Sequence, residues 1–151
     1  MPKATKFDPP RWFICTLSKS GFHNWDLCKE VGLWGIPTNG RNVGIPELKH
    51  GDGLIVYAAT RGIKAFCEVV GEVRRPKDKQ EAPWAGGVFR YGFIFPFRVV
   101  MEFDQPISTR FSSQKLQGTS ITTSQLRRGF SSINTEDGKY LLSTLSTKKK
   151  D

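Results

Sequence analysis

Sulfur and imidazole ligands are scarce in this chain. Its 151 residues include three cysteines and two histidines, and Cys15, Cys28 and Cys67 form no Cys-x-x-Cys pair. This spacing excludes a zinc knuckle, and an odd, widely spaced set of cysteines provides no disulfide framework. We therefore expect a reducing, cytoplasmic setting, with no metal and no cofactor.

Long hydrophobic runs are also missing. No window approaches the ~20 apolar residues of a membrane-spanning helix, and the N-terminal stretch MPKATKFDPP lacks the apolar run of a signal peptide. At 38% hydrophobic and 12% aromatic residues, a chain of this length can bury a core of its own. We predict a flexible leader at residues 1–10, one domain at 11–145 and a basic tail at 146–151.

Acidic residues are in the minority. The chain has 14 Asp and Glu against 23 Lys and Arg, a formal charge of +9. Such a balance favours a polyanionic partner, with nucleic acid as the first candidate. The alternative role for any single cation is ordinary solubilising charge. The candidate phosphate contacts are Arg41, Lys115, Arg127 and Arg128, with the lysines at 148–150 as an auxiliary group.

The common catalytic motifs are missing from the sequence. It contains no Gly-x-Ser-x-Gly elbow, no Gly-x-x-x-x-Gly-Lys loop and no His-Glu-x-x-His pair. His23 and His50 have no carboxylate or cysteine at ligand spacing, so we expect polar loop or helix-end positions for both. The sequence therefore predicts a binding module and not an enzyme.

Strand patterns dominate what is present. Apolar and β-branched runs predict strands at 11–18, 54–59, 65–73 and 91–103, the middle two forming a hairpin. Pro96 must bend the last strand or place it at an edge. Helical spacing predicts a helix at 22–31 ended by Gly32, a single turn at 47–49, and a closing helix around Leu141 and Leu145. This order predicts an α+β fold, a small, partly closed β-barrel flanked by short helices.

Two of the four tryptophans lie between glycines and prolines. Trp34 stands in Gly-Leu-Trp-Gly-Ile-Pro and Trp84 in Pro-Trp-Ala-Gly-Gly, so we expect both on loops. A loop tryptophan can stack on a base. Stacking contributes ~1–3 kcal/mol, which roughly offsets the few kcal/mol needed to flip a base from a duplex. The alternative is that both rings plug the ends of the barrel.

Residues 12–57 resemble the EVE domain of the PUA-like superfamily, which also includes the YTH domain. The resemblance rests on the segments WFICTLS, NWDLCKEVGLWGIP and LKHGDGLIVYA, the last with Gly-Asp before a hydrophobic strand. The YTH pattern is similar over 24–37, with an asparagine ten residues before the tryptophan, and at 86–89. The likeness covers most of residues 11–145, apart from 74–87 and 104–125.

The resemblance implies a PUA-like fold and a reader of modified bases. In these families an aromatic pocket accepts a flipped, often methylated, base. By that analogy two tryptophans and a tyrosine form the walls, while an asparagine and a glycine backbone bind the base edge. The implied pocket residues are Trp34, Trp84, Tyr57, Tyr91, Asn24 and Gly35, and the rim residues are Ser18, Lys19, Ser20, Pro37 and Asn39.

The resemblance also suggests a biological setting. EVE domains commonly act in modification-dependent restriction systems, where a fused or separate nuclease or motor cuts the DNA. Modified DNA is therefore the favoured partner. RNA with a modified base is the first alternative, and a protein-interaction module with a basic surface is another.

An enzymatic alternative comes from ASCH domains of the same superfamily, some of which act on modified nucleosides. Their motif, Gly-x-Lys-x-x-Glu-x-Arg, is matched incompletely by Gly62, Lys64 and Glu68. The Lys-to-Glu spacing is one residue too long, and no Arg follows at the required place. We expect Lys64 and Glu68 to form a surface pair instead.

Overall fold

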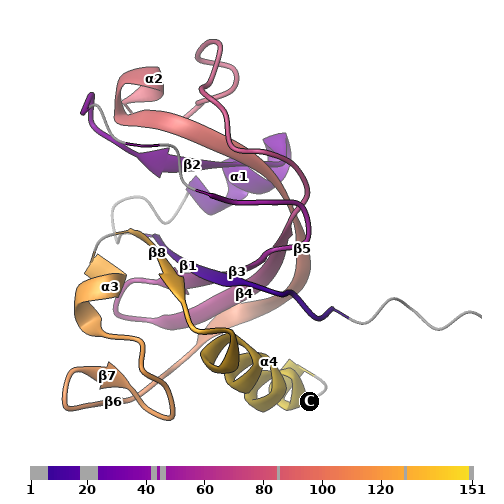
Figure 1. Ribbon diagram of the computed structural model, residues 1–151, viewed down its shortest axis with the longest axis vertical. Coiled ribbons are helices and arrows are strands. Elements are labelled where there is room, and N and C mark those ends of the chain that lie inside the picture. Colours follow the sequence, from indigo (N-terminus) through magenta and orange to yellow (C-terminus); the bar gives the residue numbers. More distant parts are fainter. Residues whose placement is uncertain are drawn as a thin grey trace, which may run out of the picture.

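The structure, a computed structural model, describes residues 7–17, 24–41, 44, 47–84, 86–127 and 129–149. Six strands form one sheet in the order β2-β5-β4-β3-β1-β8, and β6 and β7 form a separate hairpin. The six-stranded sheet curls into a half-barrel with β2 and β8 at its edges (Figure 1). Its strands are β1 Trp12–Leu17, β2 Leu33–Pro37, β3 Gly53–Ala58, β4 Gly62–Val69, β5 Tyr91–Ile107 and β8 Phe130–Ile133. The other elements are β6 Phe111–Ser112, β7 Lys115–Leu116, α1 Asn24–Val31, α2 Gly87–Arg90, α3 Thr123–Arg127 and α4 Thr135–Lys149.

The central strands follow from local sequence patterns. β3 and β4 pair antiparallel, which confirms the predicted hairpin. Its connection ends at Gly62, whose φ of 128° favours glycine, and a Cβ there would collide with the carbonyl oxygen of Ile107. β1 lies parallel to β3, so the chain crosses over between them through α1 and β2.

β5 is long enough to serve two neighbours. Residues 91–96 pair with β2, and the strand from Phe97 onward pairs with β4. Pro96 lies at this changeover, where it has no N–H to donate but accepts a hydrogen bond from the Val70 N–H at 3.0 Å. The strand predicted at 91–103 is confirmed and extends to Ile107.

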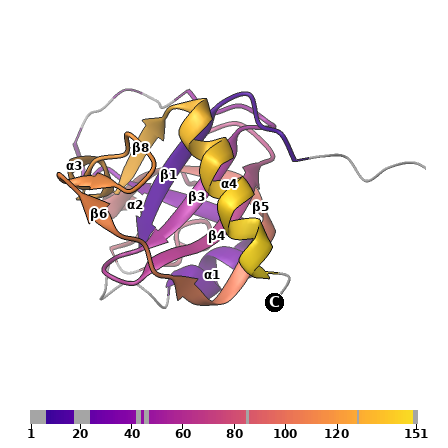
Figure 2. The same ribbon diagram turned by 90° about the horizontal axis from the view of Figure 1, so that it is seen from below.

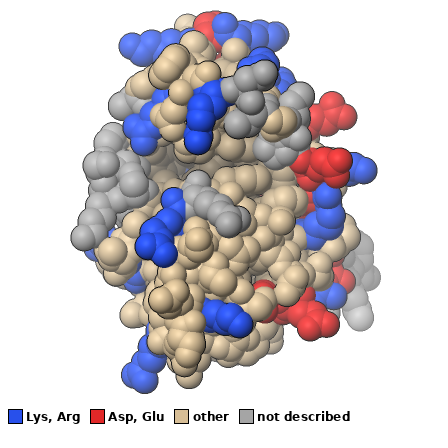
Figure 3. All heavy atoms as spheres, turned by 60° about the vertical axis from the view of Figure 1, so that its left-hand side comes forward, with Lys and Arg blue, Asp and Glu red and all other residues tan. Residues whose placement is uncertain are grey.

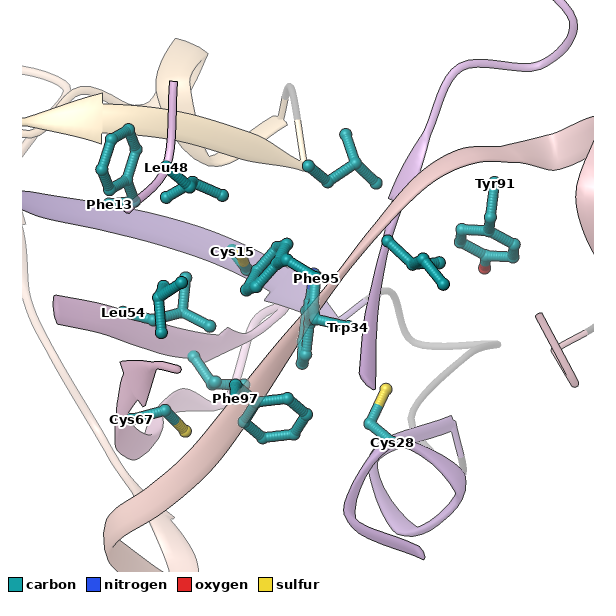
Figure 4. Packing of buried hydrophobic residues seen from close by; sticks show 14 of the residues in the cluster. Phe13, Cys15, Cys28, Trp34, Leu48, Leu54, Cys67, Tyr91, Phe95 and Phe97 are labelled. Carbon is teal, nitrogen blue, oxygen red and sulfur yellow. The ribbon is translucent and has the colours of Figure 1, made fainter. Parts of the chain in front are cut away.

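Two hydrophobic clusters cover the two faces of the sheet. The larger lies inside the half-barrel and includes Leu54, Phe95 and Trp34 (Figure 4). The smaller lies under α4, which runs across the opposite face (Figure 2), and Leu141 and Leu145 are buried in it as the helical pattern predicts. Within the described ranges, no helix combines the length and apolar character that crossing a bilayer requires.

Trp34 lies in a strand, and the loop prediction for it is wrong. It occupies β2 and pairs with Phe95 of β5. Glycine and proline around Trp34 suggest a loop only on local grounds, because an edge strand tolerates both residue types when a distant strand supplies the pairing. Trp84 does lie in an irregular segment, directly before α2.

The predicted Lys64–Glu68 surface pair is also wrong. Lys64 is buried, and its Nζ donates to the backbone oxygens of Phe103 at 2.6 Å and Asp104 at 3.1 Å. Glu68 instead pairs with Arg98 at 2.6 Å. Lys64 is the extra residue of a β-bulge, because Val56 of β3 pairs with Ala65 and Tyr57 pairs with Ile63. This shift breaks the simple alternation from which the pair was predicted.

Smaller differences concern turns and chain ends. Residues 47–49 form no helical turn; a tight turn closes instead when the Asp52 N–H donates to Lys49 O at 3.0 Å. His50 is exposed in that turn, as predicted, and His23 lies outside the described residues. The tail predicted from residue 146 begins inside α4, which continues to Lys149.

Candidate functional site

One large pocket opens between two groups of elements. β2, α1 and the end of α2 line one side of it, and β6, α3 and the end of β1 line the other. Its volume is about 920 Å³, near the top of the range for sites that enclose drug-sized ligands, ~300–1,000 Å³. Figure 3 looks toward this side of the molecule, where a hollow separates an upper from a lower lobe.

The structure brings all six predicted pocket residues to this pocket. They come from α1, β2, β3, β5 and the segment before α2, so only the fold places them together. The rim candidate Pro37 and the cation Arg127 line it as well. Asn39, Arg41 and Lys115 are not among its lining residues, and Ser18, Lys19, Ser20, Arg128 and Lys150 lie outside the described residues.

Gly35 allows two aromatic rings to approach the backbone of β2. A Cβ at this position would lie 2.6 Å from Cζ3 of Trp84 and 2.9 Å from Cδ1 of Tyr91. The two rings contact each other edge to face, with centroids 5.0 Å apart. They form an L-shaped aromatic wall that a larger residue at position 35 would displace.

Trp34 belongs to the core as much as to the pocket. Successive strand residues point to opposite faces, so its ring lies on the other face of β2 from the Tyr91 ring that approaches Gly35 (Figure 4). Its ring lies edge-on to Trp25 and Phe97, with centroids 6.3 Å and 6.1 Å away. Only 4% of Trp34 is exposed, so truncating it would damage the fold together with the pocket.

Two polar atoms of pocket-lining residues have no hydrogen-bond partner among the described residues. They are the Asn24 Oδ1 acceptor and the Trp84 Nε1 donor, and both are shielded from solvent. The sulfur of Cys28 lies near Trp84 Nε1, but a thiol is a weak acceptor and the two are not in hydrogen-bond geometry. An unpaired buried polar atom costs ~1–3 kcal/mol. A ligand edge that carries one donor and one acceptor could satisfy both.

Cys28 lines the same pocket one helical turn after Asn24. Burial raises the pKa of its thiol to about 12, and the nearby Trp84 indole only partly opposes this shift. The thiol is therefore neutral at physiological pH and has the character of a small apolar wall, not of a nucleophile.

The pocket mouth is basic. Arg90 and Arg127 line it on opposite sides, and Arg110 and Lys115 are exposed on the elements next to Arg127. In the part of the chain that the structure describes, none of these four forms an ion pair. Lys and Arg side chains lie on both lobes in Figure 3, whereas acidic side chains gather along its right-hand side.

Several pocket residues escaped sequence reasoning. Cys28 had a signal, because it lies four residues after Asn24 and therefore on the same helix face. Phe111 and Gln114 had none, since they come from the region 104–125, which shows neither a clear period nor a family pattern. The described side chains include no group of three or more His, Cys, Asp or Glu arranged to hold a metal ion.

Comparison with protein-family models finds no match, and comparison with curated protein sequences finds none either. Solved structures do match. The YTH domain of Toxoplasma CPSF4, in apo form, has a TM-score of 0.60 and 15% identity, covering 97% of this chain and 94% of that one. The YTH domain of Zygosaccharomyces rouxii MRB1, in complex with N6-methyladenosine RNA, has a TM-score of 0.58 and 15% identity, covering 95% of this chain and 92% of that one.

A further match is protein PSPTO5229 from Pseudomonas syringae, with a TM-score of 0.56 and 15% identity, covering 88% of this chain and 98% of that one. These similarities extend over nearly the whole chain and concern the arrangement of sheet and helices. The predicted fold class is thereby confirmed: the chain has the α+β, PUA-like fold of YTH domains, a half-barrel flanked by short helices.

Proposed function

We propose that this protein binds nucleic acid that contains a modified base and that the 920 Å³ pocket encloses that base after it has flipped out. The observation that carries the proposal is the convergence of Asn24, Gly35, Trp84 and Tyr91 on one pocket with an unpaired acceptor and an unpaired donor. A fold shared with a YTH domain bound to N6-methyladenosine RNA supports it.

The aromatic wall supplies affinity and senses a methyl group. Stacking of a base on an aromatic ring is worth ~1–3 kcal/mol. A methyl group adds apolar area worth ~25 cal/mol per Å² when buried. One methyl group therefore distinguishes a modified from an unmodified base by ~1–3 kcal/mol, or about 5- to 150-fold in affinity.

The unpaired polar atoms supply base identity. Asn24 Oδ1 would accept a hydrogen bond from an amino or imino group of the base, and Trp84 Nε1 would donate one to a ring nitrogen or carbonyl. A base that mismatches this pattern leaves a buried polar group unpaired, which costs ~1–3 kcal/mol. No step here needs a nucleophile or a metal, so we propose binding without catalysis.

RNA is the partner that we propose first, because a similar structure holds methylated RNA. The residues themselves favour neither RNA nor DNA. Methylated DNA, in a modification-dependent restriction system with a nuclease or motor partner, is the second proposal and rests on the resemblance of residues 12–57 to EVE domains. The basic mouth around Arg90 and Arg127 suits the phosphates of either.

Fluorescence anisotropy with matched oligonucleotides tests the proposal. The panel contains RNA and DNA probes with adenine, N6-methyladenine, cytosine, 5-methylcytosine or 5-hydroxymethylcytosine at one position. The proteins are wild type, Asn24→Ala, and Gln105→Ala as an exposed control on β5. We expect one modified probe to bind at least 5-fold tighter than its unmodified partner, and Asn24→Ala but not Gln105→Ala to weaken its binding. Equal affinity for all probes, unaltered in Asn24→Ala, would overturn the proposal.

A further inference from the structure

The pocket is larger than a single base requires. Its aromatic wall, formed by Trp84 and Tyr91 beside Gly35, lies on the β2 side. The opposite side is lined by Phe111, Gln114 and Arg127, which belong to or adjoin the β6–β7 hairpin and α3. Figure 1 shows this hairpin and α3 well separated from β2 and α2. One pocket of about 920 Å³ is lined by residues of both sides, which leaves room for a second part of the ligand.

The backbone of Phe111 is fixed by strand pairing, but its ring is partly exposed. It pairs with Leu116 across the hairpin, so both side chains lie on the same face. Leu116 is 1% exposed and anchors the hairpin in the second core cluster, whereas Phe111 is 41% exposed. The side chain of Leu116 is therefore packed in the core, whereas the ring of Phe111 is accessible from the pocket. An aromatic ring with an open face on a rigid hairpin suits stacking.

The turn of the hairpin is strained, which indicates that its conformation is imposed by its surroundings. Ser113 and Gln114 have φ values of 52° and 64°, although a turn with two such residues favours asparagine and glycine. The Thr123 N–H fixes it by donating to the Gln114 carbonyl at 3.0 Å. Phe111 and Gln114 are thus presented at the pocket by a rigid platform.

Cations stand beside this platform. Arg127 lines the same pocket as Phe111, and two further cations are exposed, Arg110 directly before β6 and Lys115 on β7. The described residues provide no carboxylate in ion-pair distance of any of the three. A phosphate that joins two nucleotides would pair with one of these cations.

We infer that the pocket holds two consecutive nucleotides of a single strand, with the modified base at the Trp84–Tyr91 wall and a neighbouring base stacked on Phe111. This inference rests on the proposed function and specifies its ligand. The recognised unit is a single-stranded segment of at least two nucleotides, because a neighbour still paired in a duplex cannot leave its stack for Phe111. Base stacking of this kind tolerates every base, so the neighbour adds affinity and little sequence preference.

A cycle of protein and ligand changes tests the inference. The probes are a fluorescein-labelled five-nucleotide RNA with central N6-methyladenine, its unmodified partner, and versions in which the 5′ or the 3′ neighbour is abasic. The proteins are wild type, Phe111→Ala, Phe111→Tyr, and Phe89→Ala, the last a control at a phenylalanine that is 69% exposed on α2. A thermal melt of each variant shows that it folds.

One abasic neighbour is expected to weaken binding to wild type and to Phe89→Ala by about 5- to 100-fold. The same abasic probe is expected to bind Phe111→Ala no more than 2-fold weaker than the intact probe, and Phe111→Tyr is expected to behave as wild type. An equal abasic penalty in wild type and Phe111→Ala, at both neighbours, would overturn the inference.

The two proposals fail in different ways. Loss of preference for the modified base, with the Phe111-dependent abasic penalty retained, would overturn the proposed function and leave the stacking site standing. A preference for the modified base without that penalty would do the reverse. Failure of wild type to bind both this RNA and the matching DNA would overturn both.

Discussion

Gly35 is the residue that sets the shape of the aromatic wall. Its missing side chain leaves room for Trp84 and Tyr91, which approach the position of a Cβ to 2.6 Å and 2.9 Å. Both rings are almost fully buried, so neither can withdraw without opening the surrounding core. The wall is therefore shaped by a residue that contributes almost no surface of its own.

Gly35→Ala should weaken binding of the preferred oligonucleotide at least 10-fold and lower the free energy of unfolding by ~1–3 kcal/mol, because overpacking displaces both rings. Urea denaturation and anisotropy measure the two effects. Gly44→Ala is the matched control, since a Cβ at Gly44 meets no atom within 4 Å. Unchanged affinity in Gly35→Ala would show that the ligand does not contact this wall.

Asn24→Ala should separate binding from stability. Its Oδ1 accepts no hydrogen bond from the described residues, including the N–H groups of α1, so its removal deletes an unpaired polar atom. We expect the free energy of unfolding to stay within about 0.5 kcal/mol of wild type or to rise by ~1 kcal/mol. A loss above 1 kcal/mol in urea denaturation would mean that the side chain has a structural partner.

Among the elements, the loop that precedes α2 and carries Trp84 is stabilised by an ion pair between Arg74 and Glu81. Glu81 accepts two hydrogen bonds from Arg74, each of 2.7 Å, and one from the Lys77 N–H at 2.8 Å. Arg74 in turn pairs with Ile94 of β5 through two backbone hydrogen bonds. These contacts connect the loop to the sheet, and Ala82 is fully buried just before Trp84.

Glu81→Gln should loosen this loop and weaken ligand binding several-fold while α4 and the sheet remain folded. Hydrogen exchange at residues 77–84 is expected to rise, with Glu72→Gln as the exposed control. Exchange and affinity equal to wild type would show that Trp84 is positioned without the ion pair.

The same ion pair gives a pH dependence with a definite sign. The hydrogen bonds from Arg74, then that from Lys77, lower the pKa of Glu81 from 4.5 to about 2. A carboxyl group with a lowered pKa stabilises the folded state above about pH 4.5, and this contribution is lost as the pH falls toward 2. Amide exchange in 77–84, corrected for intrinsic rates, should therefore be protected down to about pH 4.5 and lose protection below it, and Glu81→Gln should remove that change.

For the molecule as a whole, the location of the positive charges matters more for ligand binding than their number. The net charge of +9 is a property of composition, but the cations at the pocket mouth have no carboxylate partner among the described residues, while others are paired. Arg11, Arg74 and Arg98, for example, each form an ion pair within 2.7 Å. Only unpaired cations release counterions in full when a phosphate binds.

Binding of the preferred single-stranded probe should therefore weaken with salt. The slope of log K against log salt changes by about −0.7 for each phosphate neutralised on a single strand. Arg127→Gln should make the slope shallower by about 0.7, whereas Lys139→Gln, on α4 next to Asp8, should leave it unchanged. An unchanged slope in Arg127→Gln would place the phosphates elsewhere.

Local sequence signals are enough to predict the elements whose stability is local and the types of residue at the site. Apolar and β-branched runs predict the strands, Gly62 the hairpin connection and Gly32 the end of α1, because strand preference and turn chemistry act over a few residues. The resemblance to EVE and YTH domains implied six pocket residues, and all six line one pocket.

The arrangement of those elements depends on contacts between segments that are distant in the sequence. Trp34 lies in a strand because β5, some sixty residues later, supplies its partner. Lys64 departs from the alternation of β4 because it is the extra residue of a bulge in the β3–β4 pairing, and β5 supplies acceptors for its buried ammonium group. Phe111 reaches the pocket because Leu116 and Ile121 anchor a hairpin that no local pattern predicts. Pairing, register and burial are cooperative properties of distant segments, so short-range sequence signals cannot specify them.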